Sequence, residues 1–481
     1  MANTEGLTQP ATAVRKPSGA VKIFYSLGQM AQGGGFDTAV GFIFFYYSAV
    51  LGLSGALVGA ALAIGLAFDG GVDPLVGSWS DNLKSRLGRR LPFMIGSIPL
   101  VALSLGLLFS PPSGLSQWGL FAWLTVLAVA TRTFASVFNV PYLALAAEMT
   151  TDSAERTSLV VYRSVAGITA GLICTALGYV VFFADGGLQR PEGYPGYGWS
   201  VAILLAVAMS LCCLGVWRYA ASLPQPEPAT GGLVTRLPGE VAEIFRNRSF
   251  RVLFLSAVIM FSAMGLNATL NSHAFVFVWR MRTETIQFIG YAYLAGLLLG
   301  VGFAPLLQKL MEKKTLIVLG ISLLMANWLV LQGLRVMGLW APVGDDAILP
   351  MMSNSFVAGI GTGLAMVAYP AMMADAADEH ELLFGRRREG LYFAGLGFAN
   401  KAASGIGVML AGIALDLVRF PRDVSQQVGV ILPEDVQVRL VMIWGPAAAV
   451  VCTISLVILM AYGISRARHA EIAVALQKVR G

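Results

Sequence analysis

Long apolar segments, separated by short polar or charged stretches, follow one another from residue 22 to residue 465. Each is long enough to cross the hydrocarbon core of a bilayer as a helix, which takes about 20 residues. Residues 91–131 carry no charge, and Pro111-Pro112-Ser113-Gly114 marks a turn between two helices within this run. The pattern predicts an all-α membrane protein with twelve spanning helices, at about residues 22–50, 57–80, 91–111, 117–148, 158–184, 198–220, 252–279, 285–309, 315–336, 347–378, 389–419 and 440–465.

The composition agrees with this pattern. Hydrophobic residues make up 56% of the 481 residues, charged residues only 12%, and the mean hydropathy is +0.71, whereas a soluble domain carries roughly a quarter charged residues. The four cysteines lie inside apolar segments, without the spacing of metal ligands or secreted disulfides. The sequence contains no nucleotide-binding loop and no Ser/His/Asp pattern. We therefore expect no enzyme activity, no cofactor and no metal site.

A Pro- and Gly-rich connection between the sixth and seventh predicted helices divides the chain into two halves. We expect a tail at residues 1–21, a six-helix half at 22–220 and a linker at 221–251 that contains an amphipathic segment, residues 237–245. A second six-helix half at 252–465 and a tail at 466–481 complete the chain. The alternating basic and aliphatic residues of this last tail predict a short surface helix.

Lysine and arginine are distributed unequally between the two sets of connections. The set that includes both tails holds 23 of them and the other set holds 7, so the positive-inside rule places both termini in the cytoplasm. The net charge of +6 then reflects contact with anionic lipid head groups rather than nucleic acid. Residues 1–20 lack the apolar core of a signal peptide. We expect a multi-pass monomer in the cell (inner) membrane.

Six ionisable residues lie well inside the predicted helices: Asp37, Asp69, Asp73, Arg132, Arg163 and Lys401. Asp69 and Asp73 are one turn apart and share a helix face. An Asp near the bilayer centre costs roughly 2.5–3.5 kcal/mol on insertion scales, so the pair requires a cation, a proton or a basic partner. We expect a polar central cavity; alternatively, some of these charges form structural ion pairs, and Arg163 could snorkel to the surface.

Several motifs carry a family resemblance. They are Asp69-x-x-x-Asp73-Pro74-x-x-Gly77-x-x-x-Asp81 with its tail Arg86-x-x-Arg89-Arg90-x-Pro92, Asn139-Val-Pro141-Tyr142, Asp152-x-x-x-Arg156, Arg163, Asp375-Ala-Ala-Asp378-Glu-His-Glu381 before Gly385-Arg386-Arg387-Arg388, and Lys401. Over nearly the whole chain they resemble the glycoside–pentoside–hexuronide:cation symporter family of the major facilitator superfamily, which includes melibiose permease. The resemblance implies twelve helices in two halves of six, a midplane cavity and alternating access.

The resemblance implies a cation site formed by Asp69, Asp73 and the hydroxyl of Ser136, with Lys401 placed to neutralise the acids when the cation leaves. Sodium prefers several oxygen ligands, but Val72 stands where a sodium-using relative supplies a carboxamide. We therefore favour the proton as the coupling ion, because two carboxylates that share a site readily hold a proton. Sodium stays possible if a backbone carbonyl or water completes its shell.

The residues implied for substrate binding depart from the family pattern. The position of the first family aspartate falls on Gly33, with Asp37 one turn later, and that of the second falls on Asn139; Tyr142 and Arg163 complete the site. Residues 33–35 are all glycine, which could re-aim the turn that carries Asp37 or simply allow close packing. Arg132, two turns before Asn139, either binds a carboxylate or phosphate group or pairs structurally with Asp37.

Charged residues near the predicted cytoplasmic helix ends form a candidate gate: Asp81, Arg86, Arg89, Arg90, Asp375, Asp378, Glu381, Arg386, Arg387 and Arg388. Acids and bases of this kind could pair across the two halves in an outward-facing state. Alternatively, they are a solvated surface that sets the topology, in which each exposed pair contributes under about 1 kcal/mol.

Three functions remain open from the sequence. The first is cation-coupled symport, with protons favoured, of a sugar, glycoside or uronide by alternating access. The second is transport of lysophospholipid-like or other anionic amphiphiles, which the neutral Gly33, Asn139 and Leu143 would suit. The third is a non-transporting receptor or scaffold, which would have no use for the Asp69–Asp73 pair. The three basic residues inside the helices favour an anionic substrate.

Overall fold

The computed structural model describes residues 16–32, 34–83, 85–150, 152–223, 233–386, 388–422 and 431–480. Within these ranges all the regular structure is helical. Eleven described helices are long and apolar enough to cross a membrane. The first expected span is built in pieces, which are α1 (Gly19–Leu27), η1 (Gly28–Ala31), α2 (Gly34–Phe45) and the π-helical η2 (Tyr46–Val50).

The other predicted spans coincide with described helices. In the first half these are α3 (Gly55–Asn82), α4 (Leu91–Leu108), α5 (Gln117–Met149), α6 (Ser153–Ala176) continued by η3 (Leu177–Phe182), and α7 (Gly193–Ala221). In the second half they are α9 (Arg248–His273) continued by η5 (Ala274–Val278), α10 (Thr283–Leu310), α11 (Lys313–Val336), α12 (Ile348–Phe384), α13 (Glu389–Leu417), and the continuous α14 (Glu434–Met442), η8 (Ile443–Ala447) and α15 (Ala448–Met460). The break predicted at residues 111–114 is confirmed, because it lies between α4 and α5.

Two described α-helices, the linker helix and the C-terminal helix, lie outside the spans, as predicted, and so does the short 3-10 helix η4 (Gly187–Gln189). The linker helix α8 (Leu233–Ile244) begins four residues before the expected amphipathic segment, and α16 (Arg466–Arg480) forms the C-terminal helix. Some boundaries differ from those expected. Helix α12 continues to Phe384, beyond the expected end at residue 378, and α14 begins at Glu434, before the expected start at residue 440. Helix α12 stops before Gly385, whose φ of 69° suits glycine. The acids from Asp375 to Glu381 therefore lie on a helix.

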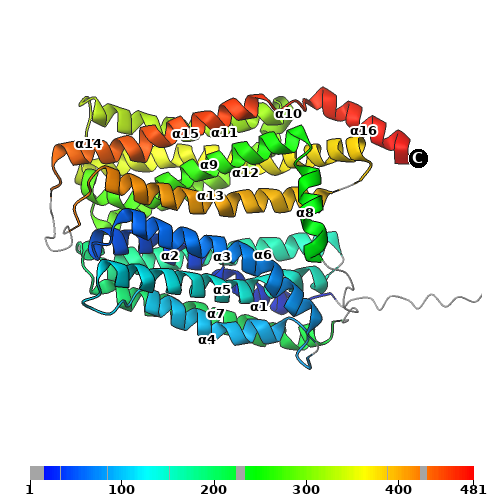
Figure 1. Ribbon diagram of the computed structural model, residues 1–481, viewed down its shortest axis with the longest axis horizontal. Helices are drawn as coiled ribbons and strands as arrows, with labels where there is room; N and C mark the ends of the chain where they lie inside the picture. Colours follow the sequence, from blue (N-terminus) through cyan, green and yellow to red (C-terminus); the bar gives the residue numbers. More distant parts are fainter. Residues whose placement is uncertain are drawn as a thin grey trace, which may run out of the picture.

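The helices of the two halves form two layers that lie side by side (Figure 1). The start of α1 and the C-terminal α16 lie at the same end, which we call the tail end; the opposite end is the far end. The layers meet mainly where α3 packs along α13, and also where α2 meets α9 and η3 meets α10. The linker helix α8 runs between the layers at the tail end.

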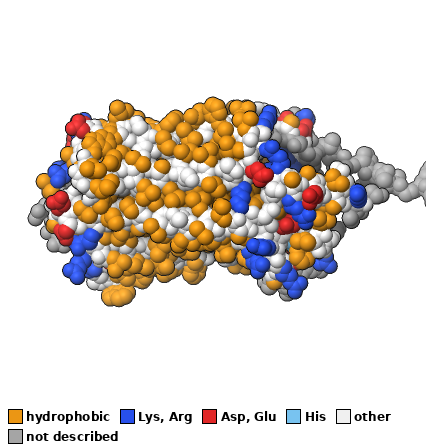
Figure 2. All heavy atoms as spheres, turned by 90° about the horizontal axis from the view of Figure 1, so that it is seen from above, with side chains coloured by type: hydrophobic (Ala, Val, Ile, Leu, Met, Phe, Trp, Pro, Cys, Tyr) orange, Lys and Arg blue, Asp and Glu red, His pale blue; other side chains and the backbone are white. Residues whose placement is uncertain are grey.

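The surface is divided by polarity along the long axis of the molecule. Hydrophobic side chains form a broad band across the middle, and Lys, Arg, Asp and Glu gather at both ends (Figure 2). Hydrophobic side chains within the spanning helices, such as Phe303 of α10 and Val207 of α7, are half-exposed, as expected for positions that face lipid. This distribution is that of a protein whose two ends lie in water and whose middle lies in the bilayer.

Glycines allow α3 and α13 to approach closely. A Cβ added at Gly412 of α13 would lie 2.1 Å from the carbonyl oxygen of Gly55 on α3, and one added at Gly59 would lie 2.9 Å from the carbonyl oxygen of Val408. Backbone therefore packs against backbone here, as small residues permit between membrane helices. This close approach brings the polar side chains of the two helices within reach of each other.

Candidate functional site

The structure brings together the four residues predicted to form the cation site. The Oγ of Ser136 on α5 donates a hydrogen bond to Oδ1 of Asp69 on α3. The Nζ of Lys401 on α13 lies 3.1 Å from Oδ2 of Asp69 and 2.5 Å from Oδ2 of Asp73. A lysine of one half thus bridges two carboxylates of the other half.

This cluster offers a hard cation or a proton several oxygen atoms. Asp69 is buried, whereas Lys401 and Asp73 have exposed side-chain fractions of 44% and 31%, so the bridge is accessible to water. Pro74 has no N–H to donate to the carbonyl of Gly70 one turn earlier, which leaves that backbone oxygen without its helical hydrogen bond. Two carboxylates with one ammonium also carry a net charge of −1, which favours uptake of one positive charge.

A cavity of about 430 Å³ adjoins the cluster, and we call it the charged cavity. Asp37, Arg132 and Asn139 line it together with the cation-site residues Asp69, Ser136 and Lys401. The guanidinium of Arg132, on α5, is attracted electrostatically by the carboxylates of Asp69 and Asp37. Yet in the described structure it forms no hydrogen bond, and no ion pair joins it to either carboxylate. The buried Oδ1 of Asn139 has no hydrogen-bond partner either. Both groups are therefore available to a ligand.

The remaining predicted substrate residues lie elsewhere. Tyr142 is buried, with its ring stacked 4.5 Å from that of Tyr25, and a Cβ added at Gly28 would lie 2.5 Å from Cε2 of Tyr142. Arg163 donates to Oε1 of Gln29 from Nε and Nη2, at 2.9 and 2.7 Å, and its guanidinium lies 5.3 Å from the Tyr142 ring centre. Gly33 lies outside the described residues. Tyr142 and Arg163 thus support the first helix, and Arg163 reaches the charged cavity through Gln29, which lines it.

Sequence reasoning missed four polar residues that line the charged cavity: Gln29, Gln32, Asn400 and Ser404. Asn400 precedes Lys401, and the Oγ of Ser404 donates back to the carbonyl oxygen of Asn400 at 2.9 Å. The available signal was their polarity inside apolar segments. That signal is weak for uncharged side chains, because Ser and Asn can satisfy themselves on their own helix.

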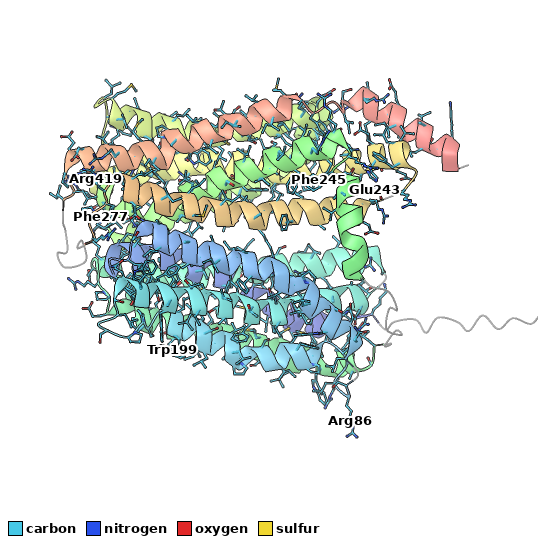
Figure 3. All side chains as sticks on the ribbon, in the orientation of Figure 1. Arg86, Trp199, Glu243, Phe245, Phe277 and Arg419 are labelled. Carbon is cyan, nitrogen blue, oxygen red and sulfur yellow. The ribbon has the colours of Figure 1, made fainter. Side chains whose placement is uncertain are left out.

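Three of the four gate residues of the first half, Asp81, Arg89 and Arg90, form a compact cluster at the tail end. Arg90 pairs with Asp81 and, at 2.9 Å, with Glu148, and it donates to the Oγ of Ser80 at 2.6 Å. Arg89 pairs with the same Glu148 carboxylate at 2.8 Å. Glu148 was not predicted, although it ends the helix that carries Arg132. Arg86 points away from the protein (Figure 3).

The gate residues of the second half pair with the linker and the C-terminal helix. Asp375 lies 2.7 Å from Lys313 and 3.3 Å from His469 of α16, and Asp378 lies 3.1 Å from His469. Arg388 lies 2.9 Å from Glu240 of α8. Figure 3 labels Glu243, near the end of α8, and Phe245 just after it. Arg386 is exposed, Glu381 lies on α12, and Arg387 lies outside the described residues.

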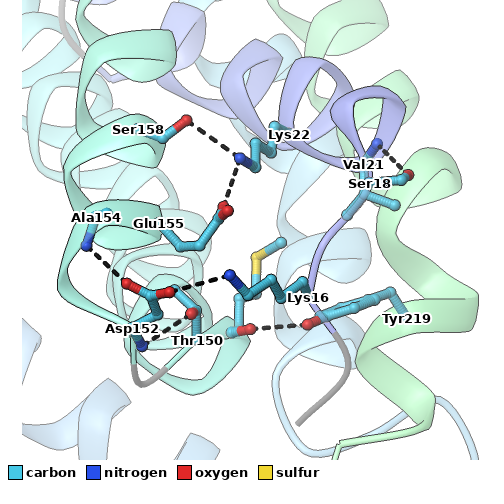
Figure 4. Close-up of polar contacts among 11 residues, drawn as sticks. Lys16, Ser18, Val21, Lys22, Thr150, Asp152, Ala154, Glu155, Ser158 and Tyr219 are labelled. Carbon is cyan, nitrogen blue, oxygen red and sulfur yellow. Dashed lines mark hydrogen bonds and ion pairs between the residues drawn. The ribbon is translucent and has the colours of Figure 1, made fainter.

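Polar contacts also hold the segment that contains Lys16 and Lys22 to α6 (Figure 4). Lys16 lies 3.1 Å from Asp152, which caps α6 by accepting from the Ala154 amide at 2.9 Å. Two hydrogen bonds lower the pKa of Asp152 below its usual range: the one from Lys16 contributes most, and the one from the Ala154 amide contributes next. Lys22 pairs with Glu155 at 2.5 Å. All these contacts stay within the first half.

The far end, in contrast, is closed by contacts between the halves. The Oγ of Ser48 on η2 lies 3.0 Å from Nε2 of His273 on α9, and the rings of Phe45 and Phe277 stack with centres 5.8 Å apart. Figure 3 shows Phe277 at this end, near Arg419. Asp416 of α13 caps α3 by accepting from Ser54 Oγ at 2.5 Å and from the amides of Gly55 and Ala56 at 3.0 Å each.

Comparison with known proteins identifies the family. Residues 24–466 match the profile of a family described as MFS/sugar transport protein. The chain is 24% identical to the isoprimeverose transporter of Lactiplantibacillus pentosus, over 85% of this chain and 82% of that one. It is 25% identical to the glucuronide carrier protein homolog of Escherichia coli, over 82% of each chain.

Two further similarities bear on fold and on a shorter segment. The sodium-dependent lysophosphatidylcholine symporter 1 of Mus musculus is 36% identical over 120 residues, which are 24% of this chain and 22% of that one. The crystal structure of a bacterial homolog of the human lysosomal transporter Spinster, inward-facing and unoccupied, superposes with a TM-score of 0.60 at 13% identity. That superposition covers 95% of this chain and 96% of the other. It shows a common fold.

Proposed function

The chain belongs to the MFS/sugar transport protein family, and from this premise we propose that it is a secondary active transporter that couples uptake of an anionic sugar to a cation. It is a multi-pass membrane transporter of the major facilitator superfamily, and not an enzyme. The observation that carries the coupling is the position of Lys401, whose ammonium lies between Asp69 and Asp73.

The coupling follows from competition for the same oxygen atoms. A proton or cation that enters between Asp69 and Asp73 neutralises the charge that holds Lys401, so the electrostatic attraction between α13 and α3 weakens. When the ion leaves, Lys401 returns and compensates the buried charge, which would otherwise be costly. Movement of the two halves is thus tied to ion occupancy, which is what alternating access with coupling requires.

The proposed conformation is inward-facing, with both termini in the cytoplasm. The far end is held shut by Ser48–His273 and by the Asp416 cap, whereas the described ion pairs at the tail end stay within one half or reach the linker helix α8. The proposed coupling ion is the proton, because Val72 supplies no oxygen ligand beside Asp73. Sodium remains the alternative, with the Gly70 carbonyl as an added ligand.

The substrate class follows from the charged cavity. Arg132 presents a guanidinium without an ion-pair partner to this cavity, and Asn139, two turns away on α5, presents an unpaired amide oxygen to it. This combination suits a carboxylate attached to a hydroxyl-bearing ring, because arginine binds carboxylates through two parallel hydrogen bonds. The similarity to a glucuronide carrier homolog supports a uronate.

A second candidate, an anionic amphiphile, is favoured by one observation. An apolar cavity of about 530 Å³, lined by residues such as Phe261, Met366 and Phe393, adjoins the charged cavity at Asn400 and Ser404. Such a cavity could hold an acyl chain while the head group lies at Arg132. The segment similar to a lysophosphatidylcholine symporter agrees with this candidate.

The deciding experiment is ligand-dependent thermal stabilisation of the purified protein. It compares glucuronate, its neutral counterpart glucose and a lysophospholipid at equal concentration. We expect glucuronate to stabilise best and Arg132→Gln to weaken its binding about 10- to 100-fold, the loss of a bidentate charge-assisted contact. Arg282→Gln, which removes the same charge at the far end, is the control. Stabilisation by the lysophospholipid alone would favour the amphiphile, and equal binding of both sugars by wild type and Arg132→Gln would reject an anionic substrate.

A further inference from the structure

A second cavity, of about 390 Å³, lies between the halves and is lined by a different kind of residue. We call it the amide cavity. It adjoins the charged cavity along α2, where Asp37 lines one and Thr38 lines the other. Six carboxamide side chains line it: Asn267, Asn271, Gln287, Asn327, Gln332 and Asn354. Among the described residues that line it, none is charged.

Hydrogen bonds within the protein hold several of these carboxamides in place. Asn267 donates from Nδ2 to the carbonyl oxygen of Trp444 at 2.7 Å, and Nε1 of Trp444 donates to Oδ1 of Asn271 at 2.8 Å. Asn354 donates from Nδ2 to the carbonyl oxygen of Asn327 at 2.9 Å. Each bond uses one end of a carboxamide and orients the other. Because these side chains are already oriented, a ligand that binds them causes little further loss of side-chain entropy, which is the advantage of a preorganised site.

Gln332 provides an independent sign that a polar ligand belongs here. Its side chain is 1% exposed and lines the amide cavity, yet its Oε1 has no hydrogen-bond partner in the described structure. Buried polar atoms are nearly always paired, and an unpaired one is costly. A ligand that donates a hydrogen bond to this oxygen would remove the cost. Aromatic residues, among them Trp328 and Trp444, also line the cavity and offer flat apolar faces.

We propose that the amide cavity is a second binding subsite, which takes the neutral, hydroxyl-rich part of a substrate whose charged part lies at Arg132. This inference rests on the proposed function and extends the substrate from a single uronate to a uronate linked to a neutral sugar. Hydroxyl groups donate and accept, as carboxamides do, and the apolar face of a sugar ring packs on an indole. An acyl chain would leave the carboxamides unpaired, and a second charged group would find no counter-charge in the described lining.

The test uses the purified full-length protein in lipid nanodiscs, with tryptophan fluorescence and calorimetry as binding readouts. The probes are glucuronate, a disaccharide of glucuronate linked to a neutral hexose, and a neutral disaccharide. Gln332→Leu and Asn327→Leu are the variants, because neither removes a side-chain hydrogen bond that the structure describes. Asn82→Leu is the control: it removes an exposed carboxamide that does not line the cavity, together with the hydrogen bond of that carboxamide to the carbonyl oxygen of Ser78.

We expect the acidic disaccharide to bind wild type more tightly than glucuronate does. Each variant should weaken the acidic disaccharide about three- to tenfold, the loss of one or two neutral hydrogen bonds, and leave glucuronate unchanged. Asn82→Leu should change neither.

The subsite is rejected if the neutral sugar adds no affinity in wild type, or if the variants weaken both acidic probes equally. If the proposed function is wrong, Arg132→Gln leaves the binding of both acidic probes unaffected. Gln332→Leu would still weaken binding of the neutral disaccharide, and the amide cavity would be a binding site without an anionic substrate. If none of the three probes binds, both proposals are wrong.

Discussion

Helices α3 and α13 contact each other across the two halves in two places that differ in chemistry. At the far end, Asp416 of α13 caps the N-terminus of α3 through the Ser54 hydroxyl and two backbone amides. Nearer the middle of both helices, Lys401 of α13 lies between Asp69 and Asp73 of α3. The first contact joins a carboxylate to groups that carry no titratable charge, and the second joins opposite charges that a small ion can separate.

The contrast between the cap and the bridge indicates which part of this helix pair can respond to an ion. The Asp416 cap satisfies helix N–H groups, which carry no charge for an ion to displace. The Lys401 bridge can be replaced whenever a proton or cation neutralises its carboxylates. We therefore regard the cap as a latch for the far end and the bridge as the element that senses the coupling ion.

The largest effect is expected from removing one carboxylate of the bridge. Asp69→Asn or Asp73→Asn should abolish gradient-driven accumulation, with the internal substrate concentration reaching only that outside, because the ion loses its ligand. Substrate counterflow and folding should persist. Accumulation in vesicles is the measurement, with Asp435→Asn at the exposed far end as control. Full uphill transport by both variants would reject the ion site.

The identity of the ion should produce the next largest effect. We expect uptake to collapse when a protonophore removes the proton gradient, and to persist when choline replaces sodium, because Val72 leaves a sodium ion short of side-chain oxygens. Radiolabelled uptake under the four combinations of proton and sodium gradients measures this. A strict requirement for sodium would contradict the argument from Val72 and assign a ligand role to a backbone carbonyl.

Removing the latch should have an intermediate effect. Asp416→Ala deletes a cap whose loss costs about 0.5–2 kcal/mol, which amounts to about a 2- to 30-fold shift of the population toward an open far end. A cysteine introduced at Thr38 should then react faster with a membrane-impermeant thiol reagent added at the far end. Asp435→Ala, which breaks only a pair within α14, should leave the rate as it is; an unchanged rate in Asp416→Ala would show that the cap does not hold the far end.

The smallest effect is expected at the tail end. Asp378→Arg reverses the charge beside His469 and should shift cysteine accessibility of the charged cavity toward the tail-open form, by an amount worth under about 1 kcal/mol because these groups are partly exposed. Lys478→Glu, near the end of α16, serves as a charge-reversal control. Unchanged labelling in Asp378→Arg would mean that these charges are a solvated surface rather than a gate.

Features that depend on neighbours along the chain could be predicted from the sequence alone. Apolar length predicted the spans, and the spacing of Asp69 and Asp73 placed both on one helix face. The prolines and glycine after Phe109 predicted the turn before α5. These predictions succeed because the bilayer imposes a minimum apolar length and the helix imposes a fixed period, and both are local properties. The family motifs supplied Ser136 and Lys401 as partners for the acids.

The contacts between side chains of different helices could be seen only in the tertiary structure. It placed Asp416 at the N-terminus of α3, held Arg163 on Gln29 and left Arg132 without an ion pair in the charged cavity. It also gathered carboxamides from α9 to α12 around Gln332. These contacts depend on the rotation and closeness of packed helices, which glycines such as Gly412 set through backbone contact. An uncharged Asn or Gln in an apolar segment looks the same in sequence whether it faces lipid, a neighbour or a ligand, because its helix period is identical in each case.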